Sequence, residues 1–375
     1  MELRNRQKRL WAEIDLDKIK HNFDLIGGNV CCVVKADAYG HGACVLAKYY
    51  EELGAVYFAV SNIEEAIQLR KYGIKKPILV LGYTPAECAC VLAKYNIEQT
   101  VYSYDYAVLL SKEATSSDVK VNVHIKIDTG MGRIGFQYHD KHNELELAYK
   151  SCVMNNLIPK GVFTHFAVAD EGINDFTTKQ YKLFSEAIDW LKARGVKFEV
   201  CHCSNSAAIL WYPNYHMDMV RAGIVLYGLG SNSTQSDLQP VLTLKSVVSN
   251  VKTINKGDSI SYGRTFVADK DMKVATVPIG YADGYYRSNT GNCVFINNRK
   301  CQIIGRVCMD QLMVVVDGAS IGDEVEIYGP HITVDDVAKY NNTIPYEVLC
   351  SIAERVPRVY TKNGEIVEIV DKLSR

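Results

Sequence analysis

The chain has 375 residues, of which 48% are hydrophobic and 23% charged, so it can bury a sizeable core and lies outside the composition of disordered proteins. At about 150 residues per domain, this length predicts two to three domains, or one barrel-sized domain with a smaller companion. Lys and Arg total 42 against 43 Asp and Glu, and a net charge of −1 gives no field to attract nucleic acid or anionic lipid. We therefore expect no nucleic-acid partner.

The sequence contains no apolar segment of membrane length. No uncharged apolar run reaches about 18 residues, and the basic start MELRNRQKRLW is not followed by the apolar segment of a signal peptide. We therefore expect a soluble, cytoplasmic chain without direct membrane contact.

Twelve cysteines raise the question of a metal site. Cys31 lies inside the apolar run NVCCVVKA, and one residue separates Cys88 from Cys90 and Cys201 from Cys203. Zinc sites commonly have two to four residues between such pairs. We expect most of the cysteines to be reduced and buried, and we expect no bound metal.

In the first part of the chain, short apolar runs alternate about eight times with amphipathic helical patterns. The helical patterns include NIEEAIQLRKYG, which stops at Gly73, and the stretch from Asp175 to Gly195. Apolar strands joined by crossover helices predict a parallel sheet, and eight units favour a closed (β/α)8 barrel of the TIM type over residues 1–235. An open doubly wound sheet is the alternative. The expected strands are 29–36, 57–62, 78–82, 99–103, 122–128, 160–167, 198–204 and 219–227.

After about residue 235 the pattern changes. Runs rich in Val, Ile and Thr follow one another, separated by turns of Gly, Asn and Asp. This pattern predicts a mostly-β domain over residues 236–375, with one short helix in VDDVAKYNN and a hairpin at Asn363-Gly364.

Functional side chains of such a barrel collect at the C-terminal ends of its strands. Lys35 ends the first expected strand, Arg133 follows the fifth, His165 ends the sixth and Arg221 lies on the eighth. An amine at the end of a strand of Val and Cys is partly desolvated, which favours the neutral form that attacks a carbonyl group. The alternative is a lysine that extends to solvent.

Polar groups at the seventh and eighth strands predict a phosphate site. Ser204 and Asn205 precede a helix start, and the amides near Gly223 and Ile224 follow the eighth strand, which is where barrels usually bind phosphate. A lysine that forms a Schiff base together with a phosphate site indicates pyridoxal phosphate.

The segment Gly130–Gly135 matches GxGxxG, which raises the alternative of a dinucleotide site. The motif lies in the fifth unit rather than the first, carries Arg133 in its loop, and is not followed by an acidic strand end about 20 residues on. Arg133 is better suited to a carboxylate, as in a small amino-acid substrate.

Eight segments, VVKADAYGHG, KIDTGMGRIG, THFAVAD, NSAA, VRAGIVLYG, SYGRTF, PIGYADGYYR and GRVCMDQ, occur in this order. Together they resemble the alanine racemase family over nearly the whole chain. The resemblance implies a pyridoxal-phosphate-dependent isomerase with an N-terminal barrel and a C-terminal β domain. It also implies a homodimer in which each active site is completed by the partner subunit. The expected activity is the interconversion of L- and D-alanine, of L- and D-serine, or of both, which supplies D-amino acids for peptidoglycan precursors.

The resemblance assigns roles to individual residues. Lys35 holds the cofactor and acts as a base on one face of the substrate, and Tyr262 of the partner acts on the opposite face. Lys126 is the lysine that becomes carbamylated and steadies Arg133. The implied cofactor contacts are Tyr39, His165, Asn205, Ser206, Arg221 at the pyridine nitrogen, Gly223 and Ile224. The implied substrate contacts are Arg133, Met309 and, at the entrance, Tyr281.

Glu354 departs from the family pattern. It precedes RVPR, where the family commonly has a tyrosine that contacts the phosphate and narrows the substrate pocket. A carboxylate beside a phosphate is repulsive, so Glu354 either points away or pairs with a cation. We expect a more permissive site that accepts serine, as in the racemase domains associated with vancomycin resistance. The basic start, Arg4 to Arg9, would then be the end of a linker from a membrane domain; the alternative is a flexible terminus.

Two other activities fit parts of the sequence. A pyridoxal-phosphate-dependent amino-acid decarboxylase shares the barrel-plus-β plan, but the VCMDQ segment fits the racemase better. A non-catalytic pyridoxal-phosphate-binding regulator would resemble the barrel alone, whereas this chain has the further C-terminal residues that carry Tyr262 and Met309.

Overall fold

The computed structural model describes residues 9–230 and 237–373. The chain divides into two compact units, which we call the barrel unit (22–38 and 43–238) and the sheet unit (1–21, 39–42 and 239–375). The expected domain boundary after residue 235 lies outside the described residues, as do Arg4, Arg6 and Lys8 of the basic start.

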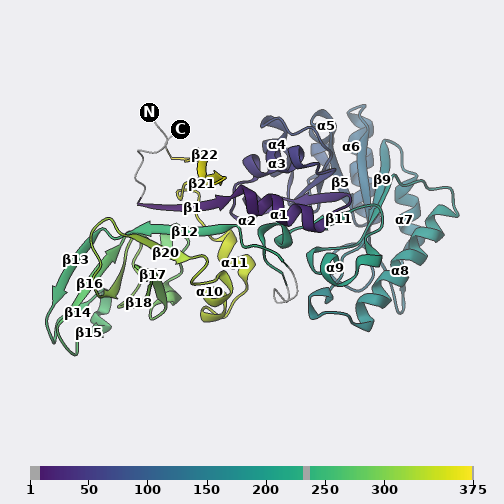
Figure 1. The fold of residues 1–375 in the computed structure, drawn as a ribbon. Helices are drawn as coiled ribbons and strands as arrows, with labels where there is room; N and C mark the ends of the chain where they lie inside the picture. The colour runs from purple at the N-terminus through teal and green to yellow at the C-terminus, as the bar shows by residue number, and fades with distance from the viewer. Residues whose placement is uncertain (1–8, 231–236, 374–375) are drawn as a thin grey trace. The chain divides into compact units, whose positions relative to one another are not determined.

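Eight parallel strands form the centre of the barrel unit, in the order β10-β9-β6-β5-β4-β3-β2-β11. Two backbone hydrogen bonds join the segments of the first and last strands, from Asp218 to Cys201 (3.1 Å) and from Arg221 to Ser204 (2.9 Å). Each expected strand overlaps one observed strand, although β5, β6 and β9 begin one to three residues earlier than expected. The predicted (β/α)8 barrel is confirmed (Figure 1). The strands are β2 (Val30–Val33), β3 (Tyr57–Val60), β4 (Ile78–Val80), β5 (Ile97–Val101), β6 (Val121–Asp128), β9 (Leu157–Phe163), β10 (Val200–His202) and β11 (Val220–Ala222).

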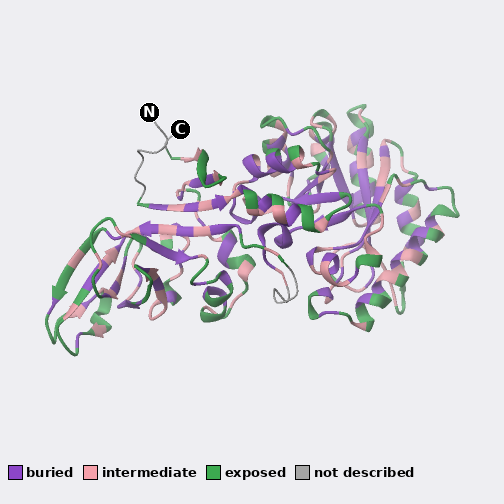
Figure 2. Cartoon of the chain, viewed as in Figure 1, coloured by how far each residue is buried: buried purple, intermediate pink, exposed green. Residues whose placement is uncertain are grey.

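Helices lie around the outside of these strands, and their outward faces are exposed while the strands are buried (Figure 2). In α8, Phe184, Ala187, Ile188 and Leu191 are buried, the spacing of one helical face. Helix α4 begins after Asn62, whose side chain accepts a hydrogen bond from the Glu65 amide. The helices from α1 to α9 are α1 (Leu16–Ile26), α2 (Lys35–Tyr39), α3 (Ala43–Leu53), α4 (Ile63–Lys71), α5 (Ala89–Lys94), α6 (Tyr104–Ser116), α7 (Leu145–Cys152), α8 (Asp175–Lys192) and α9 (Ser206–Trp211).

The sheet unit contains a ten-stranded sheet in the order β13-β16-β19-β18-β17-β20-β12-β1-β21-β22. Strand β1 (Leu10–Asp15), which the sequence analysis did not predict, pairs with β12 antiparallel and with β21 parallel. Its sequence LWAEID alternates buried and half-buried residues, the period of a strand with one face in the core. The other strands are β12 (Leu242–Val247), β13 (Asn250–Ile254), β16 (Met272–Val277), β17 (Cys293–Ile296), β18 (Arg299–Ile304), β19 (Leu312–Val316), β20 (Glu324–Tyr328), β21 (Arg358–Lys362) and β22 (Glu365–Val370).

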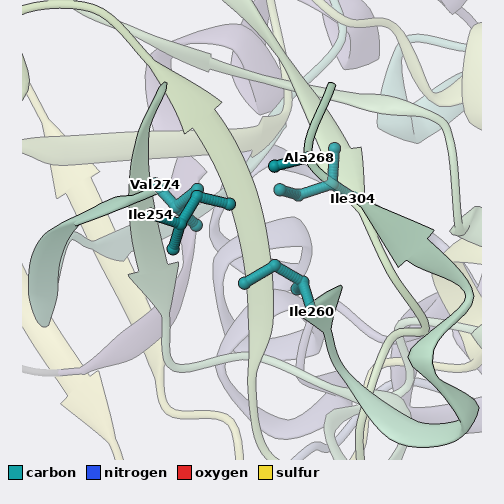
Figure 3. Packing of buried hydrophobic residues seen from close by; sticks show 5 residues of the cluster. All are labelled: Ile254, Ile260, Ala268, Val274 and Ile304. Atoms are coloured by element: carbon teal, nitrogen blue, oxygen red, sulfur yellow. The ribbon is translucent and has the colours of Figure 1, made fainter. Parts of the chain in front are cut away.

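A small apolar cluster lies under the two-stranded sheet of β14 (Ser259–Ile260) and β15 (Phe266–Val267). Its side chains come from β13, β14, β16, β18 and the residue after β15, and they point toward one another (Figure 3). This packing fixes the start of the loop that carries Tyr262. The cluster consists of Ile254, Ile260, Ala268, Val274 and Ile304.

Two expected local features of the sheet unit are present. The predicted helix is α10 (Val334–Tyr340), and the Asn363-Gly364 turn joins β21 to β22 with both residues at positive φ. A second helix, α11 (Pro345–Cys350), was not predicted.

No helix among the described residues is long and apolar enough to cross a membrane. Within the same part of the chain, no group of three or more His, Cys, Asp or Glu side chains is arranged to hold a metal ion.

Candidate active site

Most of the predicted site residues of the barrel unit lie at or near the C-terminal ends of the barrel strands. Lys35 begins α2 after β2, His165 follows β9, and Arg221 lies on β11. His165 is buried, and its pKa is lowered by that burial and by the positive charges of Arg221, Lys126, Arg133 and Lys35. The structure therefore brings the side chains of these four basic residues together around His165.

The chain after Lys35 forms a left-handed turn that the sequence analysis did not predict. Ala36, Asp37, Ala38 and Tyr39 all have φ between 52° and 54°. This conformation costs roughly 1–2 kcal/mol per non-glycine residue, so its surroundings must hold it. The Ala38 amide donates to the Val34 carbonyl at 2.9 Å. The backbone that carries Lys35 is thus fixed at the start of a strained segment.

Arg221 is buried and hydrogen-bonded on several sides. Its Nη2 donates to the carbonyls of Thr164 (2.8 Å) and Cys203 (2.9 Å) and lies 3.3 Å from Nδ1 of His165. A guanidinium group has donors only, so it can donate to the unprotonated nitrogen of a pyridine ring but cannot accept from it. Arg221 therefore has the chemistry expected of a partner for the pyridine nitrogen.

A chain of buried hydrogen bonds leads away from Arg221. Nη1 donates to Nδ1 of His202 at 2.8 Å, and Nε2 of His202 lies 3.0 Å from Nδ1 of His124. Nε2 of His124 lies 2.7 Å from the Glu98 carboxylate. Because Arg221 can only donate, Nδ1 of His202 accepts, so every bond in the chain has its donor on the Arg221 side. The tautomers of both histidines follow from this direction.

The two ends of this chain have opposite charges. Burial and the charge of Arg221 lower the pKa of His202, which therefore stays neutral. Burial acts to raise the pKa of Glu98, but the hydrogen bonds from His124 and Tyr57 lower it overall. The sequence analysis missed Glu98, His124 and His202; they appear in the sequence only as polar residues inside apolar strands.

The predicted phosphate-binding residues lie together after β10 and β11. Asn205 caps α9 by accepting from the Ala208 amide at 3.0 Å. The Ser206 hydroxyl accepts from the Gly223 amide at 2.9 Å, and Ile224 begins the next 3-10 turn. Since the Gly223 amide is bound to Ser206, its contact with a phosphate stays a prediction. Tyr39, at the end of α2, belongs to the sheet unit, where its ring centroid lies 5.9 Å from that of Tyr346.

Lys126 lies on β6 and is only 3% exposed. Its Nζ has no hydrogen-bond partner among the described residues and lies 5.0 Å from the ring centroid of Phe163. Burial and the charge of Arg221 hold the pKa of Lys126 well below its usual 10.5. Burial and the nearby charges of Arg221 and Arg133 thus favour the neutral form of this amine.

Replacing Lys126 by methionine should stabilise the protein in buffer free of carbon dioxide, and more at pH 7 than at pH 10. The unfolded chain binds a proton at this amine that the folded protein does not, so the destabilisation by Lys126 shrinks as the pH rises toward 10.5. The contribution of Lys126 to the free energy of unfolding changes by at most about 1.4 kcal/mol per pH unit. Denaturant unfolding of both proteins at the two pH values measures the difference in their free energies of unfolding, and a difference that does not narrow at pH 10 would contradict the lowered pKa of Lys126.

The GxGxxG segment forms a loop around a carboxylate. Oδ1 of Asp128 accepts hydrogen bonds from the amides of Gly130 (2.9 Å), Met131 (2.8 Å) and Gly132 (3.2 Å). The loop leads into strand β7 (Phe136–His139) rather than into a helix. Its amides are therefore used by the protein itself, which disfavours the dinucleotide alternative, and Arg133 is left exposed within it.

Three other predicted residues are exposed on connected loops of the sheet unit. Tyr262, Tyr281 and Met309 are 70%, 44% and 52% exposed. Ser261 Oγ donates to the Arg306 carbonyl at 2.7 Å, and the amides after Gly280 donate to the carbonyls of residues 308 and 309 at 3.1 and 3.0 Å. Asp283, missed by the sequence analysis, anchors the turn of Tyr281. Burial acts to raise its pKa, but Arg9 and Arg355 lower it overall.

Glu354 pairs with a cation. Its carboxylate lies 2.8 Å from Nζ of Lys372, and its side chain is 79% exposed. Of the two arrangements expected for this carboxylate, the structure therefore has the ion pair.

Comparison with known proteins decides the family. A model of the alanine racemase N-terminal domain matches residues 14–231, and a model of the C-terminal domain matches residues 241–360. The chain belongs to the alanine racemase family. It is 44% identical to alanine racemase 1 of Clostridium acetobutylicum, over 96% of this chain and 97% of that protein.

Solved structures agree with this assignment. The structure of alanine racemase from Clostridium difficile 630 has a TM-score of 0.93 at 40% identity, covering 97% of this chain and 99% of that one. Alanine racemase from Bacillus anthracis with bound L-Ala-P has a TM-score of 0.92 at 37% identity, covering 98% of each chain. The family depends on pyridoxal phosphate, so the predicted racemase fold, enzyme class and cofactor are confirmed.

Proposed function

We propose that this protein interconverts L- and D-alanine with pyridoxal phosphate held by Lys35, and so supplies D-alanine for peptidoglycan precursors. The observation that carries the proposal is the buried, donor-only Arg221 at the strand ends where Lys35 begins α2. A pyridine nitrogen would meet there a donor that cannot protonate it. The buried Nζ of Lys126 and the grouping of Asn205, Ser206 and Gly223 are also compatible with this cofactor.

The Lys35 amine would hold pyridoxal phosphate, and the bound cofactor would supply the electron withdrawal that makes the substrate Cα proton acidic. Arg221 would donate a hydrogen bond to the pyridine nitrogen and so leave it unprotonated, which would moderate that electron withdrawal and disfavour side reactions such as transamination. The Lys35 amine takes or returns the Cα proton on one face, and the Tyr262 phenol does so on the other. The exposed Arg133 guanidinium binds the substrate carboxylate and holds the Cα–H bond between the two bases.

The proposed site is shared between two copies of the chain. Tyr262 is exposed and has no role in the core of its own unit, and it follows Ser261, which has φ of 68°. A strained residue beside an exposed tyrosine on a hydrogen-bonded loop is typical of a functional contact, and tyrosine is enriched at protein interfaces. We therefore assign Tyr262, with Tyr281 and Met309, to the substrate side of the partner's site.

Lys126 is proposed to carry a carbamate. Its neutral amine attacks carbon dioxide, the new N–C bond forms, one proton is released, and a negative charge replaces the neutral Nζ. Arg221 and Arg133 are close enough to act on the Lys126 charge state, so a carbamate there would be attracted to both. Its role would be to steady Arg133 for the substrate carboxylate.

Substrate preference depends on the pocket at Glu354. Because Glu354 replaces the family's tyrosine and pairs with Lys372, we propose a wider site that turns over serine as well as alanine. The expected result is measurable kcat/KM for both L-alanine and L-serine in an enantiomer-exchange assay. A serine value thousands of times below that of alanine would contradict the wider site. Release of carbon dioxide from either amino acid would favour the decarboxylase alternative.

The substrate and product also bear on the place of action. Peptidoglycan precursors with D-amino acids are assembled from small soluble molecules, so we propose a cytoplasmic enzyme. The linker to a preceding membrane domain stays a separate hypothesis, since Arg4, Arg6 and Lys8 lie outside the described residues.

A further inference from the structure

Glu65 lies in the first turn of α4, beside the ends of two neighbouring barrel strands. Its Oε1 accepts a hydrogen bond from the Ala36 amide at 2.7 Å, and its Oε2 accepts one from the Ser61 amide at 2.7 Å. Ala36 directly follows Lys35 after β2, and Ser61 follows β3. One carboxylate therefore joins the C-terminal ends of β2 and β3.

This bridge continues the pairing of the two strands. Val33 faces Ala59 in the parallel ladder, and the Val34 amide donates to the Ala59 carbonyl at 2.9 Å. The ladder between β2 and β3 ends at this pair. Glu65 supplies the next link, at the residue after Lys35.

The Ala36 end of the bridge holds the first residue of the left-handed turn. Ala36 has φ of 52° and ψ of 51°, a conformation that alanine keeps only where its surroundings hold it. Hydrogen bonds to a carboxylate are about twice as strong as those between neutral groups. A second carboxylate acts further along the turn, where Oδ1 of Asp37 accepts from the Ala43 amide at 2.8 Å.

We propose that Glu65 is a positioning residue for Lys35. By holding Ala36 in the left-handed region, it sets the direction in which the Lys35 side chain leaves the end of β2. Glu65 acts through the backbone and touches neither cofactor nor substrate. The proposal rests on the proposed function, because the position of Lys35 is read out through its link to pyridoxal phosphate.

The test is Glu65→Gln in the full-length protein. Glutamine keeps the size of the side chain, but its amide nitrogen would face one of the two backbone N–H groups and repel it. The affinity of the cofactor-free protein for pyridoxal phosphate, from titration of the visible absorbance band, should fall about tenfold, the size typical of residues that orient a ligand. Glu64→Gln, at the exposed neighbouring position in the same helical turn, is the matched control and should keep the wild-type affinity.

A rescue separates this role from simple capping of α4. Glycine enters the left-handed region without the steric penalty of a Cβ, so Ala36→Gly should reduce the need for the bond to Glu65. The double variant Ala36→Gly with Glu65→Gln should regain at least half of the lost affinity on a logarithmic scale. If Glu65 only capped α4 through Ser61, a change at Ala36 would restore nothing.

Two results would overturn the proposal: wild-type affinity in Glu65→Gln, or a loss that Ala36→Gly leaves unchanged. Thermal unfolding of each cofactor-free variant shows whether it is folded. If Glu65→Gln does not fold, Glu65→Asp, with a carboxylate one methylene shorter, takes its place in the same comparison. A wild-type protein that binds no pyridoxal phosphate would instead contradict the proposed function, so the two failures are distinguishable.

Discussion

Replacing Lys35 by alanine should lower kcat/KM for alanine racemisation by at least about 10³-fold. The substitution removes the amine that we propose holds the cofactor and acts as one of the two bases, and a single general base alone contributes about 10²–10⁴-fold. The loss should be equal from L- and from D-alanine, because the equilibrium constant between enantiomers is fixed. Enantiomer exchange followed from each side measures it.

The control for this variant is Lys71→Ala, a change at an exposed lysine in the last turn of α4. It removes one positive charge from the same unit and should leave the rate unchanged. Full activity in the Lys35 variant, with the protein still coloured by its cofactor, would mean that another residue does this chemistry.

Replacing Tyr262 by phenylalanine should lower kcat by about 10²–10⁴-fold while the cofactor remains bound. The change removes one hydroxyl from an exposed side chain, so the fold should not be affected. Proton transfer on the face opposite Lys35 then lacks its base. Tyr83→Phe, at a tyrosine that is 63% exposed in the barrel unit, is the matched control.

Mixing these two inactive variants tests whether the site is shared. In a dimer of one Lys35→Ala chain and one Tyr262→Phe chain, one of the two sites would have both native residues if Tyr262 acts on the partner. Random mixing should restore about a quarter of the wild-type activity, since about half of the dimers are mixed and half of their sites are intact. No recovery after verified subunit exchange would place Lys35 and Tyr262 of one site on the same chain.

The barrel could be predicted because its strands are buried on both sides. Such strands are continuous apolar runs, as in VCCV of β2, and their C-terminal ends point to Lys35 and Arg221. The alternation of apolar and polar residues in LWAEID also indicates strand β1. The basic residues just before it favoured the interpretation of this region as a linker.

The remaining features depend on contacts between distant positions. Glu98, His124 and His202 are polar residues in three different strands, and only the assembled sheet brings them into one chain of hydrogen bonds. The local sequence does not predict the left-handed turn at Ala36, because alanine disfavours this conformation. Its first residue is instead hydrogen-bonded to Glu65, which lies in α4 and is distant in the sequence.

The most direct test of the central claim is to reduce the cofactor-loaded protein with borohydride and find the modified lysine by peptide mass spectrometry. Reduction makes the bond between cofactor and protein permanent, so the label marks the residue that held it. We predict a single pyridoxyl group on the peptide that contains Lys35. A label on another lysine, or none on a protein that still racemises alanine, would contradict the account.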